Sequence, residues 1–399
     1  MNLIKKHLVV ISPHFKLFIK DQIVAISRFF DKTTVLIPQP YFPRAFLNIH
    51  FFEKRFLFIK SAAESCNEAK FYDHVHVICP KFFTLPVEVM RRRDPLLVAR
   101  SSIKMLNRND VEFSLIHAHR LDIGFTGAML KDLYNKPLIV TCHGSDVYDF
   151  PFRNHFCYAV AKYTLSRVDH VIAVCRSDAE KLLSLGLSSR KLSIIPNGFN
   201  HNFFKPIPQQ LARKRLGLPL NKKMILSVGT LHEVKGFEYL IDAIHMISKV
   251  RDDTITVIVG SGPLERKLRE KIEKLDLKQR VSLIGWEPHN NIPLWMNASD
   301  IFVLPSLNEG FPTVIPEVMA CGKPVIGTRV GGIPDAILND EVGFLVNPKD
   351  PEMLAQAIIE ALNRRWDTEK ILKNAEEYSL KKIIKKILQV YVHVTNQYV

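Results

Sequence analysis

Residues 300–328 read DIFVLPSLNEGFPTVIPEVMACGKPVIGT. The segment begins with a short apolar run typical of a buried strand and passes through the loop LNEG. It continues into VIPEVMA, which has the composition of a helix until Gly322 and Pro324 end it. PVIGT then begins a second apolar run. A strand, a helix and a second strand in this order are typical of a parallel sheet whose faces are covered by helices.

The same alternation of apolar runs and amphipathic segments extends along most of the chain. The expected strands are HLVVIS, TTVLIP, HVHVICP, FSLIHAH, LIVTCHG, DHVIAVC and LSIIPNG in the first half, and KMILSVG, TITVIVG, RVSLIGW, DIFVLPS, PVIGT and VGFLVNP in the second. Prolines, asparagines and a glycine interrupt the pattern at residues 194–219, after which a fresh strand begins. The sequence therefore predicts an α/β protein with two doubly wound, Rossmann-like domains.

Chain length leads to the same domain count, because 399 residues exceed what one hydrophobic core usually fills. We place an N-terminal domain at residues 1–200 and a C-terminal domain at residues 201–375. The last segment, residues 376–399, has apolar side chains at helical spacing and predicts an amphipathic helix that needs a surface to cover. We expect it to pack back on the N-terminal domain.

Charge and cysteine content narrow the cellular setting. The formal charge is +15, and most of the excess of Lys and Arg lies in residues 1–200. This excess indicates either a patch that docks on an anionic membrane surface or a soluble basic face, and no zinc finger, RNP-type motif or basic repeat indicates nucleic-acid binding.

Six cysteines without CxxC spacing argue against a disulfide framework and a structural zinc site. No apolar run reaches the ~18 residues of a membrane span, and no signal-peptide cleavage site follows the first strand. We expect a cytoplasmic protein, whose basic first half would reach the inner face of the cell membrane.

Ligands of open parallel sheets bind outside the carboxyl ends of the strands, so loops at those ends are where a site is expected. The second half offers SVGTLHEVKG, VGSGPLE, GWEPHNN and the LNEG loop. Glu309 lies in LNEG beside Gly310, and Glu317 lies in the second turn of the following helix. Carboxylates accept paired hydrogen bonds from the diols of a sugar or a ribose, and Lys235 could set an ammonium against a diphosphate. These groups together indicate a nucleotide sugar.

Four stretches of the chain resemble the retaining glycosyltransferases of family 4, which have two-domain GT-B architecture. They are the E-x7-E pair Glu309 and Glu317 with the surrounding EGFPTVIPEVMACGKPVIGTRVGGIPDAI, HGSDVY at residues 143–148, PNGFNHNFF at residues 196–204 and VGTLHEVKG at residues 228–236. The resemblance covers most of the chain after about residue 113. It implies that Glu309 holds the hydroxyls of the donor sugar, Glu317 the ribose diol and Lys235 the departing diphosphate. Further donor contacts are implied for Thr230, Gly262, Gly310, Phe311 and Thr313.

The resemblance also assigns residues in the N-terminal domain. His143 would reach from the loop after LIVTC toward the donor sugar and bound the acceptor site, with Asp146 nearby. Two features depart from the family pattern. Thr230 stands where family members commonly carry an arginine, so either Arg329 or another basic residue takes its place, or the leaving group loses a contact worth ~3 kcal/mol. The first strand–helix turn, VVISPHFKLFIKDQ, lacks the usual glycine-rich loop.

The resemblance implies transfer of a sugar from a nucleotide-sugar donor to a glycan or lipid-linked acceptor with retention of anomeric configuration, as by a retaining hexosyltransferase. No metal or other cofactor is expected, because Lys235 and helix N–H groups would carry the diphosphate charge. Three alternatives stay open. They are a GT-B-like nucleotide-sugar epimerase or hydrolase, a dinucleotide-dependent oxidoreductase, and a non-enzymatic protein that binds membranes or nucleic acids. The oxidoreductase has weak support, since VGSGPLE lacks the third glycine of the dinucleotide fingerprint.

Overall fold

The computed structural model describes residues 4–15, 17–41, 64–67, 72, 74–84 and 94–398. The chain divides into two compact units, of which unit 1 comprises Met1–Pro196 with Ile383–Val399 and unit 2 comprises Asn197–Lys382. The chain thus enters unit 2 after residue 196, against an expected boundary at residue 200. It returns to unit 1 at Ile383, against an expected 376.

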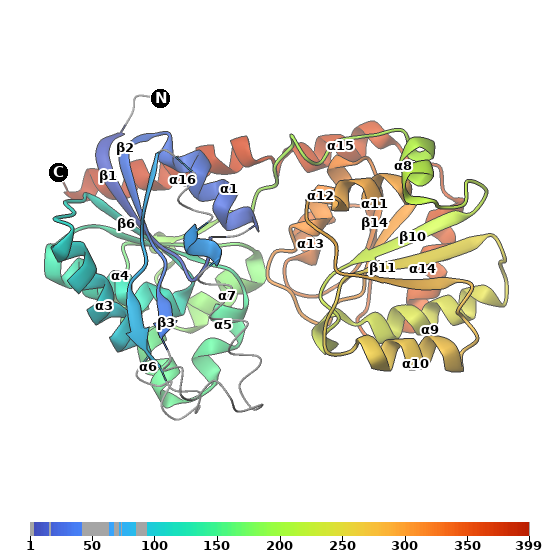
Figure 1. The fold of residues 1–399 in the computed structure, drawn as a ribbon, viewed down its shortest axis with the longest axis horizontal. Helices are drawn as coiled ribbons and strands as arrows, with labels where there is room; N and C mark the ends of the chain where they lie inside the picture. Colours follow the sequence, from blue (N-terminus) through green and yellow to red (C-terminus); the bar gives the residue numbers. More distant parts are fainter. Residues whose placement is uncertain are drawn as a thin grey trace. The chain divides into compact units, whose positions relative to one another are not determined.

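Among its described residues, unit 1 contains a seven-stranded parallel sheet in the order β4-β2-β1-β6-β7-β8-β9 (Figure 1). The strands are β1 (Ile4–Ile11), β2 (Phe30–Leu36), β4 (Val75–Ile78), β6 (Leu115–His119), β7 (Leu138–Cys142), β8 (His170–Ala173) and β9 (Leu192–Ile194). A short parallel pair joins β3 (Gln39–Tyr41) to β5 (Lys81–Phe83). Every position of β6, β7 and β8 is buried, as expected for strands covered on both faces.

The helices of unit 1 connect its strands and cover the sheet (Figure 1). They are α1 (Leu17–Ser27), α3 (Asp94–Arg108), α4 (Leu121–Tyr134), α5 (Ser145–Tyr148), α6 (His155–Arg167), α7 (Arg176–Ser184) and, from the end of the chain, α16 (Leu380–Thr395). Tyr391 of α16 is fully buried and lies edge-on to Phe30, with 5.9 Å between ring centroids. Its hydroxyl is 2.5 Å from Nδ1 of His117 in the middle of β6. The closing helix is therefore part of the core of unit 1.

Unit 2, all of whose residues are described, has a six-stranded parallel sheet in the order β12-β11-β10-β13-β14-β15. Its strands are β10 (Lys223–Val228), β11 (Thr254–Val259), β12 (Val281–Gly285), β13 (Ile301–Leu304), β14 (Val325–Thr328) and β15 (Gly343–Val346). Its helices are α8 (Gln209–Leu216), α9 (Phe237–Ser248), α10 (Glu265–Lys274), α11 (Ile292–Ala298), α12 (Val314–Ala320), α13 (Ile333–Ala336), α14 (Pro351–Asn363) and α15 (Thr368–Glu376). Helices α9, α10 and α14 cover one face, and α8, α11, α12 and α15 cover the other (Figure 1). The α/β class with two parallel-sheet units is confirmed.

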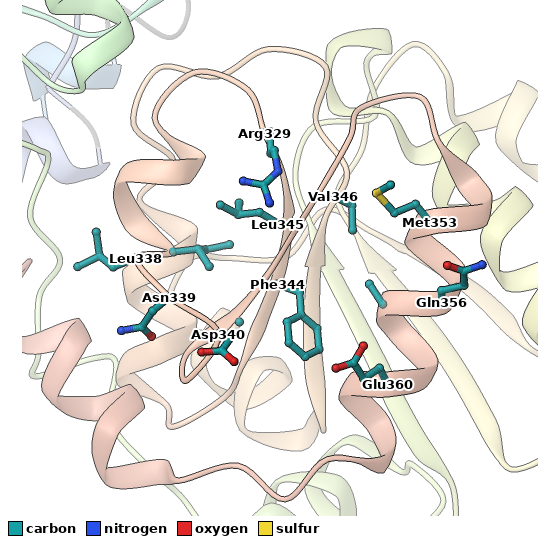
Figure 2. Close-up of a pocket in the computed structure, with 13 residues that line it drawn as sticks. Arg329, Leu338, Asn339, Asp340, Phe344, Leu345, Val346, Met353, Gln356 and Glu360 are labelled. Carbon is teal, nitrogen blue, oxygen red and sulfur yellow. The ribbon is translucent and has the colours of Figure 1, made fainter.

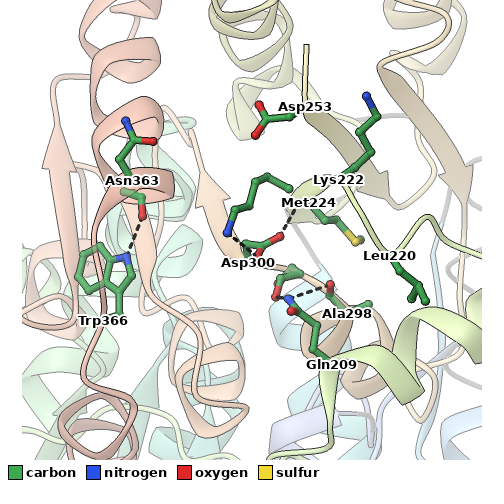
Figure 3. A network of polar contacts seen from close by, with 12 residues as sticks. Gln209, Leu220, Lys222, Met224, Asp253, Ala298, Asp300, Asn363 and Trp366 are labelled. Atoms are coloured by element: carbon green, nitrogen blue, oxygen red, sulfur yellow. Dashed lines mark hydrogen bonds and ion pairs between the residues drawn. The ribbon is translucent and has the colours of Figure 1, made fainter. Parts of the chain in front are cut away.

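A polar network holds β13 in register with β10 at the amino ends of the strands. Asp300, just before β13, accepts a hydrogen bond from the Met224 N–H at 2.6 Å (Figure 3). The same carboxylate pairs with the guanidinium of Arg213, at 2.7 Å, and the Arg213 side chain is only 5% exposed. Gln209 adds a bond to the carbonyl of Ala298 at 3.3 Å (Figure 3). Strands far apart in sequence are thereby fixed side by side, which places the loops at their other ends next to each other.

The cysteines correct one expectation. Cys66 and Cys79 form a disulfide with 6.5 Å between their Cα atoms, although their spacing in the sequence had argued against disulfides. The four other cysteines, all among the described residues, are not disulfide-bonded, and three of them are buried. Within the described ranges, no helix has both the length and the apolar character to cross a bilayer.

Candidate active site

The carboxyl ends of β10 and β13 bring Lys235 and Glu309 together. Lys235 closes a 3-10 turn (Glu233–Lys235) after β10, and Glu309 lies in the loop after β13. Lys235 Nζ donates to Glu309 Oε1 at 2.5 Å, and their side chains are 23% and 11% exposed. Buried Ser306 donates to the same carboxylate oxygen at 2.7 Å. The sequence assigned these two side chains to different parts of one ligand, and the structure adds that they form an ion pair.

Close backbone packing fixes the two loops that carry this pair. The Leu307 N–H donates to the Val234 carbonyl at 2.7 Å, which links one loop directly to the other. Gly236 has φ +65°, and a Cβ there would lie 2.0 Å from the carbonyl oxygen of Pro305. Gly331, in the loop after β14, has φ +52°, and its Cβ would lie 1.8 Å from the carbonyl oxygen of Glu309. Only glycine permits these approaches, so the glycines set the position of the carboxylate.

The segment from Gly310 to Thr313 leads into α12. The helix begins at Val314 with Thr313 as its cap residue, so Pro316 is its third residue and its missing N–H costs no intrahelical bond. Phe311 is 6% exposed and lies 5.3 Å from the ring of Tyr378. The backbone around Gly310 is held by the Gly332 N–H, which donates to the Gly310 carbonyl at 2.8 Å.

Glu317 is on the next turn of α12, where its side chain is largely buried. It is 8% exposed as a residue, and its Oε1 lies 3.5 Å from Nε2 of His289. His289 belongs to the loop after β12 and packs edge-on against Phe204, with 5.3 Å between ring centroids. Its loop, GWEPHNN, was among those expected to reach a ligand, but the histidine itself was not assigned. Its place at a strand end was the signal that could have singled it out.

Thr230 and Gly262 lie on neighbouring loops after β10 and β11. Thr230 is exposed. A Cβ at Gly262 would lie 2.5 Å from the carbonyl oxygen of Leu231, so glycine permits the contact between the two loops. The Leu231 N–H donates across this contact to the Ser261 carbonyl at 3.0 Å.

Arg329, one of the expected replacements for the family arginine, lies at the end of β14 in a different setting. It is exposed and lines a hollow of about 470 Å³ between β15 and α14 (Figure 2). Phe344 and Glu360 line the same hollow, whereas Lys235 and Glu309 do not. Within the described part of the chain, no hydrogen bond or ion pair joins Arg329 to Lys235 or Glu309.

In unit 1, His143 follows β7 and Asp146 follows three residues later in α5. Asp146 is fully buried and accepts hydrogen bonds from the backbone N–H groups of His143, at 2.9 Å, and of Leu121, at 2.8 Å. The carboxylate therefore ties the ends of β6 and β7 together from a buried position. Burial raises the pKa of Asp146, against the opposing charge of Arg120.

His119 and Arg120, at the end of β6, complete this cluster and were not assigned from the sequence. His119 Nδ1 lies 3.1 Å from His143 Nε2. Arg120 has φ +83° and ψ +145°, a backbone conformation that non-glycine residues rarely adopt. Its guanidinium pairs with Asp122 at 3.0 Å. In the described residues, no group of three or more His, Cys, Asp or Glu side chains is arranged to hold a metal ion.

Comparison with known proteins identifies the class that this fold and these loops define. Residues 59–203 match the family model Glycosyltransferase Family 4, and residues 208–378 match Glycosyl transferases group 1. The chain is 30% identical over 302 residues to the putative teichuronic acid biosynthesis glycosyltransferase TuaC of Bacillus subtilis, which covers 75% of this chain and 73% of the relative. It is 28% identical over 280 residues to the D-inositol 3-phosphate glycosyltransferase of Corynebacterium glutamicum, covering 65% and 66%.

Solved structures show the same architecture. HepE of Anabaena in complex with UDP superimposes with a TM-score of 0.73 at 21% identity, covering 97% of this chain and 100% of HepE. A second HepE complex, with UDP-glucose, has a TM-score of 0.71. The chain belongs to the family 4 glycosyltransferases and has the GT-B fold, which confirms the resemblance drawn from its motifs. It is a glycosyltransferase, not an oxidoreductase or a non-catalytic binding protein.

Proposed function

We propose that the protein transfers a hexose from a nucleotide-sugar donor to a glycan or lipid-linked acceptor with retention of anomeric configuration. The observation that carries the proposal is the Lys235–Glu309 pair at the carboxyl edge of the sheet of unit 2. A carboxylate that can accept from sugar hydroxyls and an ammonium that can meet a diphosphate lie within one hydrogen bond of each other. A donor whose sugar and phosphates are adjacent suits both groups at once.

In this proposal Lys235 exchanges its bond with Glu309 for the diphosphate when the donor binds. Glu309, still held by Ser306, then turns its free oxygen toward the sugar hydroxyls. The positive charge of Lys235 stabilises the negative charge that develops on the departing diphosphate, an effect typically worth several kcal/mol at a transition state. The backbone N–H groups of Gly310, Phe311 and Thr313 would share this charge, and no resident metal is required.

Glu317 and His289 mark the opposite end of the donor in this proposal. The largely buried Glu317 would accept from the ribose diol, and His289 keeps its carboxylate oriented from the side. Thr230 and Gly262 would line the donor between these two ends. A uridine nucleotide is the first donor to test, because the HepE structures hold UDP and UDP-glucose.

The acceptor side would be formed by His143 and the loops of unit 1. The name of TuaC refers to teichuronic acid biosynthesis, which favours a glycan under assembly as the acceptor.

The basic first half would place the enzyme on the cytoplasmic, inner face of the cell membrane, where lipid-linked glycans are accessible. Exposed Lys381, Lys385 and Lys386 of α16 add to this charge. Co-sedimentation with vesicles of anionic and of neutral lipid tests this part, and equal binding to both would contradict it.

A panel of UDP-, GDP- and ADP-sugars tests the donor. The bound donor should raise the melting temperature of the protein, because a ligand of the native state stabilises it. Product analysis with labelled donor then separates transfer from epimerisation or hydrolysis. NMR of the product's anomeric proton reports the configuration, and an inverted product would overturn the retaining assignment.

A further inference from the structure

We propose that His119 is a positioning residue for His143, which it holds in one ring orientation and in one tautomer through a hydrogen bond between the two rings. The inference rests on the proposed function in one respect, namely that His143 belongs to the acceptor side of the reaction. The geometry of the two histidines is independent of that function and can be tested separately.

The two rings meet because β6 and β7 are neighbouring parallel strands. His119, the last residue of β6, is in register with Thr141 of β7, so His143 follows two residues beyond its partner. His119 Nδ1 and His143 Nε2 are 3.1 Å apart. The rings are nearly parallel, at 12°, with centroids 5.3 Å apart. This distance and orientation describe one hydrogen bond between two imidazoles that meet edge to edge.

The burial of His119 decides its charge. The side chain is fully buried, and its Nε2 has no hydrogen-bond partner in the part of the chain that the structure describes. Burial and the nearby rings of His117, His143 and His14 hold the pKa of His119 well below its usual 6.5, so the ring is neutral and has a single N–H.

Two placements of that proton are possible. With the proton on Nδ1, His119 donates to Nε2 of His143, and a neutral His143 carries its own proton on Nδ1. With the proton on Nε2, Nδ1 of His119 accepts from the Nε2–H of His143. Each placement directs one buried N–H of the pair away from the other ring, so burial favours neither. In both placements the hydrogen bond requires one definite tautomer of His143.

His117, two residues earlier on the same strand, shows what a structural histidine looks like here. Its Nδ1 lies 2.5 Å from the hydroxyl of Tyr391 and its Nε2 lies 2.8 Å from Oγ1 of Thr141, so both nitrogens have partners inside the core. Only one ring nitrogen of His119 has a hydrogen-bond partner among the described residues, and that partner is His143. This difference separates a residue that fills the core from one that orients another side chain.

The backbone around the pair is held in a strained conformation that keeps the rings facing each other. Arg120, next to His119, has φ +83°. Its N–H donates to the Thr141 carbonyl at 2.7 Å, and Asp146 ties the N–H groups of Leu121 and His143 to one carboxylate. Strain of this kind persists only where the surroundings impose it, and it gathers at functional sites.

The test compares His119→Asn with His119→Leu. An asparagine amide can donate or accept a hydrogen bond near the position of the imidazole Nδ1, whereas leucine of similar volume can do neither. His170→Leu is the matched control, because His170 is also a buried strand histidine but bonds to Ser193, at 2.8 Å, and not to His143. Melting temperatures show whether each variant folds.

The first readout is the ¹⁵N–¹H correlation spectrum of the histidine rings in the full chain. His143 should show a single tautomer in the parent protein, His119→Asn and His170→Leu, and a mixture of tautomers in His119→Leu. A mixture of tautomers for His143 in the parent protein would overturn the proposal, and so would an unchanged single tautomer in His119→Leu. If His119→Leu does not fold, the parent spectrum still shows whether His143 is held in one tautomer.

The second readout is kinetic, with the donor that the panel identifies. His119→Leu should lower kcat by ~10- to 100-fold with little change in KM, because a misplaced group loses rate more than binding. His119→Asn should recover most of this loss, and His170→Leu should leave kcat unchanged. Equal loss of kcat in His119→Leu and His170→Leu would reduce His119 to a core residue. A protein without transferase activity that keeps the expected spectra would contradict the proposed function and not the pairing.

Discussion

Replacing Lys235 with methionine separates the role of the lysine in the fold from its role in the reaction. The substitution keeps a similar chain length and removes the ammonium that lies 2.5 Å from Glu309 Oε1. Glu309 is 11% exposed and keeps one donor, the Ser306 hydroxyl at 2.7 Å. Leaving a largely buried carboxylate with one partner typically costs about 1–3 kcal/mol, and the 23% exposure of Lys235 places this case in the lower half of that range.

The effect on the reaction should be larger than the effect on the fold. Loss of one electrostatic contact to a developing negative charge typically lowers kcat by ~10²- to 10³-fold. The assay measures kcat with the donor from the panel, beside urea unfolding of the same preparation. Lys271→Met is the control, since Lys271 is 25% exposed and lies 2.6 Å from Asp242 on the surface of α9 and α10. A kcat that stays within a factor of three in Lys235→Met, or falls equally in Lys271→Met, would refute the role of the lysine.

Three further predictions follow from other features. Burial lowers the pKa of His117 to about 3, below its value in the unfolded chain, so the unfolded state binds a proton first as the pH falls. The free energy of unfolding should therefore fall below pH ~6.5 by up to about 1.4 kcal/mol per pH unit from this residue, and a His117→Gln variant in urea titrations at several pH values should show a shallower slope. Gly331→Ala would drive a Cβ to within 1.8 Å of the Glu309 carbonyl oxygen and should cost ~10-fold or more in kcat. Gly217→Ala, also at positive φ but with no atom within 4 Å, should leave kcat unchanged. Glu317→Gln should weaken UDP binding by about 1–3 kcal/mol in calorimetry, and unchanged affinity would remove Glu317 from the donor site.

The parts of the fold that follow from local pattern could be predicted from the sequence. Apolar runs such as LIVTC and DIFVLPS became fully buried strands, because a strand covered on both faces has no polar side to show. The strand ends then located the loops that carry Lys235, Glu309 and His143, since parallel strands all end on the same edge.

What the sequence could not supply was the contacts between segments that are distant along the chain. Lys235 and Glu309 meet because β10 pairs with β13, a neighbour that is three strands further along the sequence. His119 sits in a run of buried residues, where a histidine is ordinarily a satisfied part of the core, and only the register with β7 brings it to His143. The disulfide between Cys66 and Cys79 likewise depends on the path of the chain and not on a spacing motif.

The contact between Tyr391 and His117 bears on how the chain is made. Residues 383–399 belong to unit 1, and their helix covers strands that are translated first. On the ribosome, unit 2 has all its strands and helices once residue 382 has emerged. Unit 1, although most of it is translated earlier, lacks α16 until the end of the chain has emerged. The nascent first unit therefore leaves an apolar surface open through most of synthesis, which makes it the part of the chain where chaperones would be needed.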